Sequence, residues 1–319
     1  MEVHIGPEDL RAALHDDARL GLTAPDKWLP PVWFYDDRGS KLFDDITRLD
    51  EYYPTRAERL LLDVHAAEIA DRTQADTLVE LGAGTCDKSR ILLAALVGAG
   101  TLGRYVPLDV SNTTLWEAAG GICRDFPGLQ LHAVVGDFHR HLDVLPRGGR
   151  RLVAFLGGTI GNLTQRERKR FLFDLDCTMD GDDHLLLGAD LVKDPARLVA
   201  AYDDAAGVTA EFNRNVLHVL NRELGATFEP ERFEHVARWD PESRCIEMRL
   251  RAEVSHTVDL ADLGLQIAFT AGEELRTEVS AKFTTDQVAA ELWEGGFVVE
   301  QMWDEPGGDF LLVLARPCC

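Results

Sequence analysis

The sequence predicts an α/β fold in which a second, smaller α+β domain interrupts a largely parallel, doubly wound sheet. The first observation is that, from about residue 58, helical segments alternate with continuous apolar runs bounded by Gly, Asp or Asn. Such runs are typical of parallel strands that helices cover on both faces. The second observation is that residues 233–283 instead alternate between apolar and polar side chains, as antiparallel strands with two different faces do.

The elements of the parallel sheet follow one another in a regular order. The predicted helices are residues 58–72, 88–96 and 114–126. The predicted strands are residues 77–82, 105–110, 131–138, 151–162 and 183–192. Strands that alternate with helices in this way indicate a parallel sheet in which helices connect successive strands.

The predicted insertion follows a different rhythm. Residues 196–224 have helical spacing throughout, whereas residues 245–254 and 274–283 alternate strictly between apolar and polar side chains. In the second of these strands, the alternation places Glu278 and Ser280 together on the polar face, because side chains two apart on a strand point the same way.

The chain returns to the sheet after the insertion. Residues 284–296 read as a helix, and residues 297–304 and 309–317 as two strands joined by the turn signal Glu-Pro-Gly-Gly, which predicts an antiparallel hairpin at the end of the sheet. The predicted domains are residues 57–191 with 282–319, and residues 1–56 with 192–281.

Composition argues against several classes of partner. The formal net charge of -22 repels phosphate backbones, so we expect no nucleic-acid partner. No apolar run approaches the roughly 20 residues that span a bilayer, so we expect no membrane partner. The first 20 residues carry acids where a signal peptide needs a basic start and an apolar middle, which predicts a cytoplasmic protein.

Cysteine and histidine spacing predicts neither disulfides nor a metal. The six cysteines form no C-x-x-C pair and are scattered, as is typical of free thiols in a reducing compartment. The ten histidines show no spacing that is typical of metal ligands, and we read His139 and His141 as part of a solvated loop. Because no extended apolar surface helix is evident, we expect a monomer.

The turn after residues 77–81 has the chemistry of a nucleoside site. Gly82 and Gly84 let the backbone approach a ligand closely, but Asp87 stands where a dinucleotide fingerprint has its third glycine, which disfavours an NAD-dependent dehydrogenase. At the next strand end, the Asp109 carboxylate can accept both ribose hydroxyls, although a helix N-cap is an equal alternative. One strand later, Asp137 can accept from an exocyclic amine.

The residue that follows completes this pattern. Phe138 can pack on a purine face. Three successive strand ends therefore offer glycines, a ribose acid, and an acid beside an aromatic ring. This set suits adenosine without a pyrophosphate, as in S-adenosylmethionine (SAM).

Six segments occur in an order that points to one family. They are residues 29–58, ELGAGTCDKSR at 80–90, FLGGTIGNL at 155–163, GADLVKD at 188–194, AYDDAAGVTAEFNRN at 201–215 and TEVSAKF at 277–283. Together they resemble the histidine Nα-methyltransferases of ergothioneine biosynthesis, over about residues 20–316. The resemblance implies a Rossmann-like class I SAM-dependent methyltransferase sheet. It also implies an enzyme that converts L-histidine, through its mono- and dimethylated forms, into hercynine, with S-adenosylhomocysteine as the second product.

The resemblance also implies a role for individual residues. The cofactor would lie against Gly82, Lys88, Asp109, Asp137 and Phe138. The substrate carboxylate would be held by Asn162 and Tyr202, and the imidazole would be read by Glu278 and Ser280 with Met248 nearby. Tyr52 would orient the amine, and Tyr35 would line the site beside it.

Each of these residues has a plainer interpretation. Glu278 and Ser280 could lie on a solvated strand face, Asn162 could be a turn residue, and Tyr202 and Tyr35 could be packed aromatic side chains. Two other functions also fit the fold. The chain could methylate another amino acid or a protein side chain, or it could bind SAM without catalysis.

Overall fold

The computed structural model of the protein describes residues 1–318 and divides the chain into two compact units. Unit 1 comprises Met1–Ile5, Pro54–Val192 and the chain from Lys282 onward, and unit 2 comprises Gly6–Tyr53 and Lys193–Ala281. The predicted second domain begins at residue 1, but Met1–Ile5 lie in unit 1. The reason is that strand β1 (Glu2–Val3) pairs in parallel with β5 (Val134–Val135).

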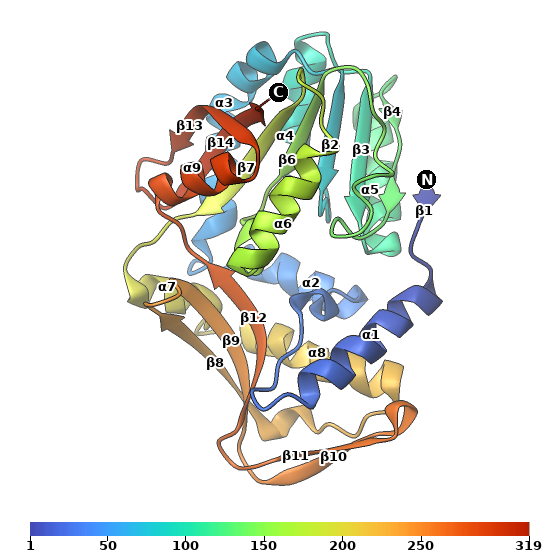
Figure 1. The fold of residues 1–319 in the computed structure, drawn as a ribbon, viewed down its shortest axis with the longest axis vertical. Coiled ribbons are helices and arrows are strands. Elements are labelled where there is room, and N and C mark those ends of the chain that lie inside the picture. Colours follow the sequence, from blue (N-terminus) through green and yellow to red (C-terminus); the bar gives the residue numbers. More distant parts are fainter. Residues whose placement is uncertain (319) are drawn as a thin grey trace. The chain divides into compact units, whose positions relative to one another are not determined.

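Unit 1 is built on one twisted sheet (Figure 1), with the order β1-β5-β3-β2-β6-β7-β14-β13 and with β4 beside β3. The remaining strands are β2 (Thr77–Leu81), β3 (Arg104–Asp109), β4 (Gln130–Leu131), β6 (Arg151–Phe155), β7 (His184–Asp190), β13 (Phe297–Asp304) and β14 (Phe310–Pro317). The pairs from β1 to β7 are parallel, whereas β14 is antiparallel to β7 and to β13. The predicted α/β class and its final antiparallel hairpin are confirmed.

The strand order reverses between β2 and β6. The chain builds from β2 outward through β3 and β5 on one side, and from β6 through β7 on the other. Every residue of β2 and β6 is buried, as is typical of parallel strands that helices cover on both faces, and the buried residues include Glu80 on β2 and Arg151 on β6. In doubly wound sheets, ligands bind beyond the carboxyl ends of the strands at such a reversal.

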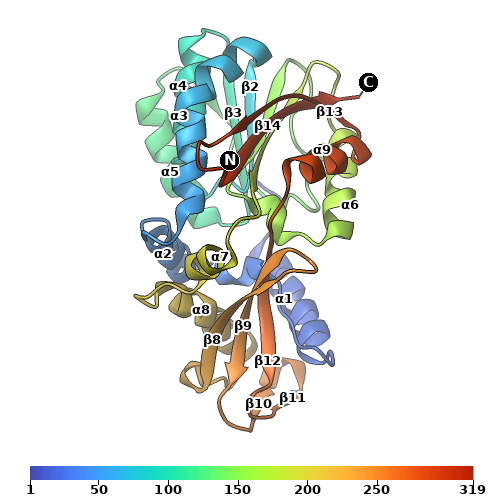
Figure 2. The same cartoon turned by 90° about the vertical axis from the view of Figure 1, so that its left-hand side faces the viewer.

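Helices cover both faces of this sheet. Figure 2 shows α3, α4 and α5 on one side of the sheet, and α6 and α9 on the other. Their bounds are α3 (Tyr53–Thr73), α4 (Ser89–Gly98), α5 (Asn112–Asp125), α6 (Gln165–Asp176) and α9 (Thr285–Glu294). The start of α6 is a capping box, in which the Thr164 hydroxyl accepts the backbone N–H of Glu167 and the Glu167 carboxylate accepts that of Thr164.

Unit 2 contains the other helices. They are α1 (Pro7–Leu22), η1 (Pro31–Phe34), α2 (Asp37–Ile46), α7 (Pro195–Tyr202), α8 (Val208–Leu224), η3 (Pro230–Arg232) and η4 (Ala261–Leu263). The prediction of one continuous helix over 196–224 is wrong, because the chain breaks between α7 and α8. Gly207 adopts a left-handed conformation (φ 75°), and the Asp204 carboxylate accepts the backbone N–H groups of Val208 and Thr209 at the start of α8.

The strands of unit 2 form a three-stranded antiparallel sheet and a separate hairpin. The sheet has the order β12-β9-β8, with β8 (Phe233–Asp240), β9 (Cys245–Ala252) and β12 (Glu274–Ala281), and the hairpin joins β10 (His256–Leu260) to β11 (Leu265–Phe269). The inward side chains of β9, including Met248 and Leu250, pack in one core with α8. The pairing of β12 with β9 is regular except for one bulge between Arg276 and Glu278.

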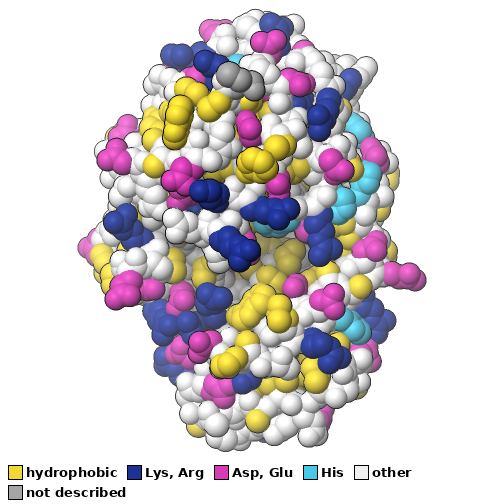
Figure 3. Space-filling model, viewed as in Figure 1, with side chains coloured by type: hydrophobic (Ala, Val, Ile, Leu, Met, Phe, Trp, Pro, Cys, Tyr) yellow, Lys and Arg dark blue, Asp and Glu magenta, His cyan; other side chains and the backbone are white. Residues whose placement is uncertain are grey.

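Charges of both signs are mixed on the face of the molecule drawn in Figure 3. On the face drawn in Figure 3, Lys and Arg side chains lie among Asp and Glu side chains, so the net charge of -22 does not gather into one acidic patch on this face. Within the described part of the chain, no helix combines the length and the apolar character that crossing a membrane requires.

Candidate active site

The glycine turn after β2 is tied to the end of β3. Gly82 and Gly84 have positive φ angles of 71° and 51°, a conformation that glycine adopts without strain. The Gly82 N–H donates to the carbonyl of Leu108 (2.9 Å), and the Gly84 N–H donates to the carboxylate of Asp109 (2.9 Å). A Cβ atom built on either glycine would meet no atom within 4 Å, so the side of the turn that these glycines face is open within the chain.

Asp109 ends β3 and organises two loops at once. One carboxylate oxygen accepts from Gly84, and the other accepts the N–H of Ser111 (2.9 Å). The N-cap of α5 is Ser111, whose hydroxyl accepts the N–H of Thr114. The alternative in which Asp109 caps that helix is therefore wrong. Burial raises the pKa of the Asp109 carboxyl above its ordinary value, and the N–H groups of Ser111 and Gly84 oppose that rise.

Asp137 and Phe138 follow the next strand in the sheet, β5. The Asp137 carboxylate accepts the N–H of His139 (2.8 Å). The Phe138 ring meets the rings of Phe155 and Phe171 edge-on, at 5.2 and 5.7 Å between ring centroids. Because β5, β3 and β2 are neighbours, the three loops with the predicted cofactor residues meet at one edge of the sheet.

Asn162 lies at the same edge of unit 1. It is the last residue of the 3-10 helix η2 (Thr159–Asn162), which follows β6. Two successive glycines with positive φ, Gly157 (80°) and Gly158 (67°), turn the chain from the strand into this helix. The side chain of Asn162 is half-buried.

Unit 2 brings the predicted substrate residues together. Tyr202, the last residue of α7, is buried, and its hydroxyl lies 2.8 Å from the Ser280 hydroxyl on β12. The ring of Tyr52 lies 6.2 Å from that of Tyr202, at an interplanar angle of 69°. Met248 packs in the same core cluster as both tyrosines.

Tyr35 joins this group through aromatic contacts. Its ring meets Phe43 at 5.6 Å and Phe212 at 5.5 Å, and Phe43 in turn meets Tyr52 at 6.1 Å. Tyr35 is 37% exposed, whereas Tyr52 is buried. Tyr35 is thus the open end of a row of rings in unit 2.

The bulge in β12 corrects the predicted facing of Glu278 and Ser280. Strict alternation predicts that both lie on the face opposite Leu275. In the structure, Thr277 is an extra residue in the ladder, so Glu278 stands opposite Met248 and Ser280 opposite Ile246. Residues directly opposite each other in a sheet share a face. Both polar side chains therefore lie on the inward face that carries Met248, and the interpretation of a solvated outer face is wrong.

Comparison with known proteins identifies the family. The sequence pattern of the family described as histidine-specific methyltransferase, SAM-dependent, matches residues 14–317. The chain belongs to this family. It is 53% identical over 312 residues to the histidine N-alpha-methyltransferases of Mycolicibacterium smegmatis and Mycobacterium tuberculosis, a match that covers 98% of this chain and 97% of each relative. It is 27% identical to the L-tryptophan methyltransferase of Psilocybe serbica, over 96% of this chain and 92% of that protein.

As a SAM-dependent methyltransferase, the protein uses SAM as its methyl donor. The residues at the carboxyl edge of unit 1 fit this cofactor. The Asp109 carboxylate accepts backbone N–H groups of Gly84, Val110 and Ser111, and its two oxygens together have about four lone-pair sites, so one can accept a ribose hydroxyl. Gly82 and Gly84 leave the turn open, Phe138 offers a ring, and Lys88, whose ammonium forms an ion pair with Glu58, lies at the start of α4.

Glu58 is a residue of this methyltransferase that sequence reasoning missed. It is fully buried on α3, forms an ion pair with Lys88, and accepts the Gly157 N–H with both oxygens at 2.7 and 2.9 Å. A Cβ atom at Gly188 on β7 would lie 2.1 Å from the Glu58 carboxylate. The signal in the sequence was Gly188, because an isolated glycine in a buried strand often marks a close approach.

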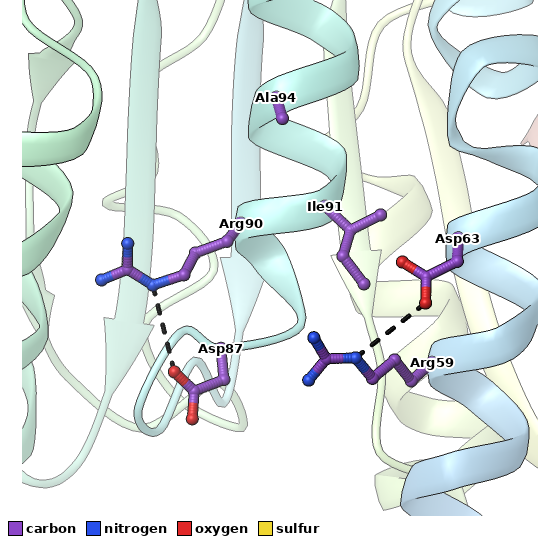
Figure 4. Close-up of a pocket in the computed structure, with 6 residues that line it drawn as sticks. All are labelled: Arg59, Asp63, Asp87, Arg90, Ile91 and Ala94. Carbon is purple, nitrogen blue, oxygen red and sulfur yellow. Dashed lines mark ion pairs between the residues drawn. The ribbon is translucent and has the colours of Figure 1, made fainter.

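One charged surface hollow in unit 1 holds none of the predicted site residues. It is lined by Arg59, Asp63, Asp87, Arg90, Ile91 and Ala94 (Figure 4). The lining carries two acids and two bases, with Arg59 3.9 Å from Asp63 and Arg90 3.9 Å from Asp87. These pairs neutralise one another, so the hollow offers no net charge to a ligand.

The methyltransferase also buries the carboxyl of Glu80, two residues before Gly82, and this predicts that its stability depends on pH. Burial raises the pKa of Glu80 on β2 to about 7 from 4.5, while hydrogen bonds from Ser89 and Tyr105 oppose the rise. Between these values the folded state holds a proton that the unfolded state has lost, so this group makes stability fall as pH rises from about 4.5 to about 7.

Glu80→Gln should remove this contribution. The stability of the variant relative to the wild type should increase with pH across the same window, as measured by urea unfolding at a series of pH values. Two stability curves that stay parallel from pH 4.5 to 7 would contradict the raised pKa.

Proposed function

We propose that the protein transfers methyl groups from SAM to the α-amino nitrogen of L-histidine three times, which gives hercynine as the first step of ergothioneine biosynthesis. The observation that carries this proposal is the gathering of Glu278, Ser280 and Tyr202 on one inward face of unit 2. The names of the relatives with 53% identity support the same substrate.

Glu278 and Ser280 are suited to read an imidazole. A neutral imidazole has one N–H donor and one nitrogen acceptor. The carboxylate of Glu278 can accept from the donor, and the hydroxyl of Ser280 can donate to the acceptor. Tyr202 and Ser280 carry one hydroxyl proton each, so their mutual hydrogen bond would be exchanged when Ser280 donates to the imidazole and Tyr202 donates to the substrate carboxylate. The proposed pocket therefore satisfies both nitrogens of one tautomer.

The tyrosines have proposed roles toward the rest of the amino acid. Tyr202 and Asn162 are the proposed ligands of the substrate carboxylate, Asn162 through its amide N–H. SAM, when bound, supplies an electrophilic methyl group on its sulfonium. The substrate amine must lose a proton before each transfer, and the buried Tyr52 hydroxyl would orient its lone pair or a water that takes the proton. The rings of Tyr52 and Tyr35 would attract the growing methylammonium.

Tyr52→Phe tests the orienting role. The ring contacts with Phe43 and Tyr202 are retained, and only the hydroxyl is lost. We expect kcat to fall by roughly fivefold, since one hydrogen bond contributes about 1 kcal/mol. Time courses followed by mass spectrometry should also show mono- and dimethylhistidine accumulating. A variant that completes all three methylations at the wild-type rate would remove Tyr52 from the mechanism.

The function itself is tested by incubating the purified protein with SAM and the twenty amino acids and following mass shifts. Histidine should gain three methyl groups while its mono- and dimethyl forms fade. Methylation of a different amino acid would keep the fold and cofactor but overturn the pocket assigned to Glu278 and Ser280. Indole has one N–H donor and no ring acceptor, so tryptophan offers no ring nitrogen to which the Ser280 hydroxyl could donate.

We also propose that the protein acts in the cytoplasm as a monomer. The cysteines that the structure describes are all free thiols, which is usual in a reducing compartment: Cys86, Cys123, Cys177, Cys245 and Cys318. Light scattering on the purified protein measures the oligomeric state directly, and a mass of twice 35.4 kDa would exclude the monomer.

A further inference from the structure

Buried polar side chains form a hydrogen-bonded chain in unit 2, next to the residues proposed to bind the substrate histidine. The Thr277 hydroxyl lies 2.6 Å from the amide oxygen of Asn213 on α8. The amide nitrogen of Asn213 lies 2.8 Å from Nδ1 of His235 on β8, and Nε2 of His235 lies 2.8 Å from the backbone oxygen of Tyr202. Thr277 and Asn213 are completely buried, and His235 is 8% exposed.

The hydrogen bonds of this chain have only one consistent direction. The carbonyl of Tyr202 can only accept, so Nε2 of His235 carries the proton and Nδ1 accepts from Asn213. The second N–H of the Asn213 amide donates to the backbone oxygen of Arg249 at 3.1 Å, and its oxygen accepts from Thr277. Burial lowers the pKa of His235, which favours the neutral ring that this pattern requires.

The same side chains bind the backbone where β12 bulges. Thr277 is the extra residue of the bulge, and its hydroxyl also lies 3.0 Å from the backbone oxygen of Met248. Asn213 holds the backbone oxygen of Arg249, the next residue of β9. These carbonyls stand beside the point where the register shifts. Asn213 on α8 donates to one of them and accepts from the extra residue Thr277 on β12, whose single hydroxyl proton points toward Asn213 and lies near the second carbonyl.

A shift of one residue in strand register moves every side chain to the other face of a sheet. Without the bulge, Glu278 and Ser280 would share the face of Arg276, away from Met248 and Tyr202. The facing of the proposed imidazole-binding pair thus depends on an irregularity in one strand. That irregularity is bound by the side chains of Thr277 and Asn213.

We propose that Asn213, His235 and Thr277 are positioning residues for amino-acid recognition. Thr277 and Asn213 hold the bulge that turns Glu278 and Ser280 inward, and His235 holds the backbone of Tyr202 at the end of α7. The network thereby aligns two elements, β12 and α7, whose side chains meet in the Tyr202–Ser280 hydrogen bond. This inference rests on the proposed function, since it assigns the network to the same amino-acid pocket.

The test compares Asn213→Ala with Asn221→Ala on the same helix. The amide of Asn221 also binds backbone, namely the N–H and the carbonyl of Phe228 at 2.8 Å each. These hydrogen bonds do not belong to the network that holds the bulge. We expect Asn213→Ala to raise KM for histidine by about 10²-fold, because small misplacements of binding groups have effects of this size. The Kd of S-adenosylhomocysteine, measured by calorimetry, should stay unchanged in both variants.

A purely structural role predicts a different result, in which both variants lower the melting temperature and neither changes KM for histidine. That result overturns the proposal. If Asn213→Ala does not fold, a comparison of Thr277→Val with Thr277→Ser tests the same network through the Thr277 hydroxyl. The valine keeps the branched shape and lacks the hydroxyl, so KM should rise, whereas serine keeps the hydroxyl and should restore a KM near that of the wild type. Equal KM values for valine and serine overturn the role of the hydroxyl.

The inference and the proposed function can fail separately. If the wild type methylates another amino acid, the same comparison is made with that substrate, and a selective rise in its KM in Asn213→Ala supports the network although the histidine assignment has failed. A crystal structure of the variant gives a readout that needs no activity. Glu278 should no longer stand opposite Met248, and an unchanged bulge overturns the proposal.

Discussion

Replacing Glu278 with alanine should lower kcat/KM for histidine by about 10³-fold. In the proposed complex, the variant leaves the imidazole N–H without its acceptor, beside the buried side chains of Met248 and Tyr202. An unpaired buried donor costs about 1–3 kcal/mol in addition to the lost hydrogen bond to a charged group. Steady-state kinetics with saturating SAM measures this loss, and binding of S-adenosylhomocysteine should not change.

Glu274→Ala is the matched control for this prediction. Glu274 lies on the same strand but before the bulge, and its carboxylate binds Arg251 at 2.8 Å across the sheet. Its replacement should leave kcat/KM for histidine unchanged. A second control uses phenylalanine, which has no ring N–H, so the Glu278→Ala variant should discriminate less between histidine and phenylalanine than the wild type does. Equal losses for both amino acids would contradict imidazole recognition by Glu278.

The sequence was sufficient to predict the sheet of unit 1, because that sheet depends on local signals. Buried parallel strands are apolar throughout, and each ends at a turn whose residues are adjacent in sequence to the strand itself. Gly82, Asp109 and Asp137 could therefore be placed at one edge of the sheet before the structure was known, and the structure puts their loops on neighbouring strands. The final hairpin was predictable for the same reason.

The facing of side chains in unit 2 depends on long-range contacts, which no local sequence pattern predicts. The alternation in 274–283 is broken by the bulge at Thr277, and the side chain that binds this bulge, Asn213, is 64 residues away in sequence. Glu58 is 30 residues before its partner Lys88. Such long-range pairs leave no trace in hydrophobic periodicity. The proposed substrate residues on β12 came from a family resemblance, and their facing required the structure.

A second large effect is expected at the opposite edge of the sheet of unit 1. Arg151 begins β6, and it is 2% exposed. Its guanidinium forms an ion pair with the fully buried Asp183 and donates to the backbone oxygens of Pro146 (3.0 Å) and Thr178 (2.7 Å). Arg151→Leu leaves the Asp183 carboxylate buried and without this partner, which destabilises a protein by about 3–5 kcal/mol.

This loss of stability should lower the denaturant concentration at which half of the protein is unfolded, as measured by circular dichroism. Arg150→Leu is the control, because the Arg150 side chain is exposed and its loss should change stability by less than about 0.5 kcal/mol. In both variants the folded protein should bind S-adenosylhomocysteine as the wild type does, since Arg151 lies at the amino end of β6 and the glycine turn follows the carboxyl end of β2. Weakened cofactor binding in folded Arg151→Leu would contradict this separation.

Removing both charges should restore only part of the stability. A buried ion pair replaced by apolar residues of similar volume is often neutral, because the cost of desolvating two charges disappears together with their attraction. Here the Asp183 carboxylate also accepts the backbone N–H groups of Arg151 and Asp180, each at 2.8 Å. Arg151→Met with Asp183→Leu leaves both N–H groups unpaired, at about 1–3 kcal/mol for each. We therefore expect the denaturation midpoint of the double variant to lie between those of Arg151→Leu and the wild type. A midpoint equal to that of the wild type would mean that water binds these backbone N–H groups.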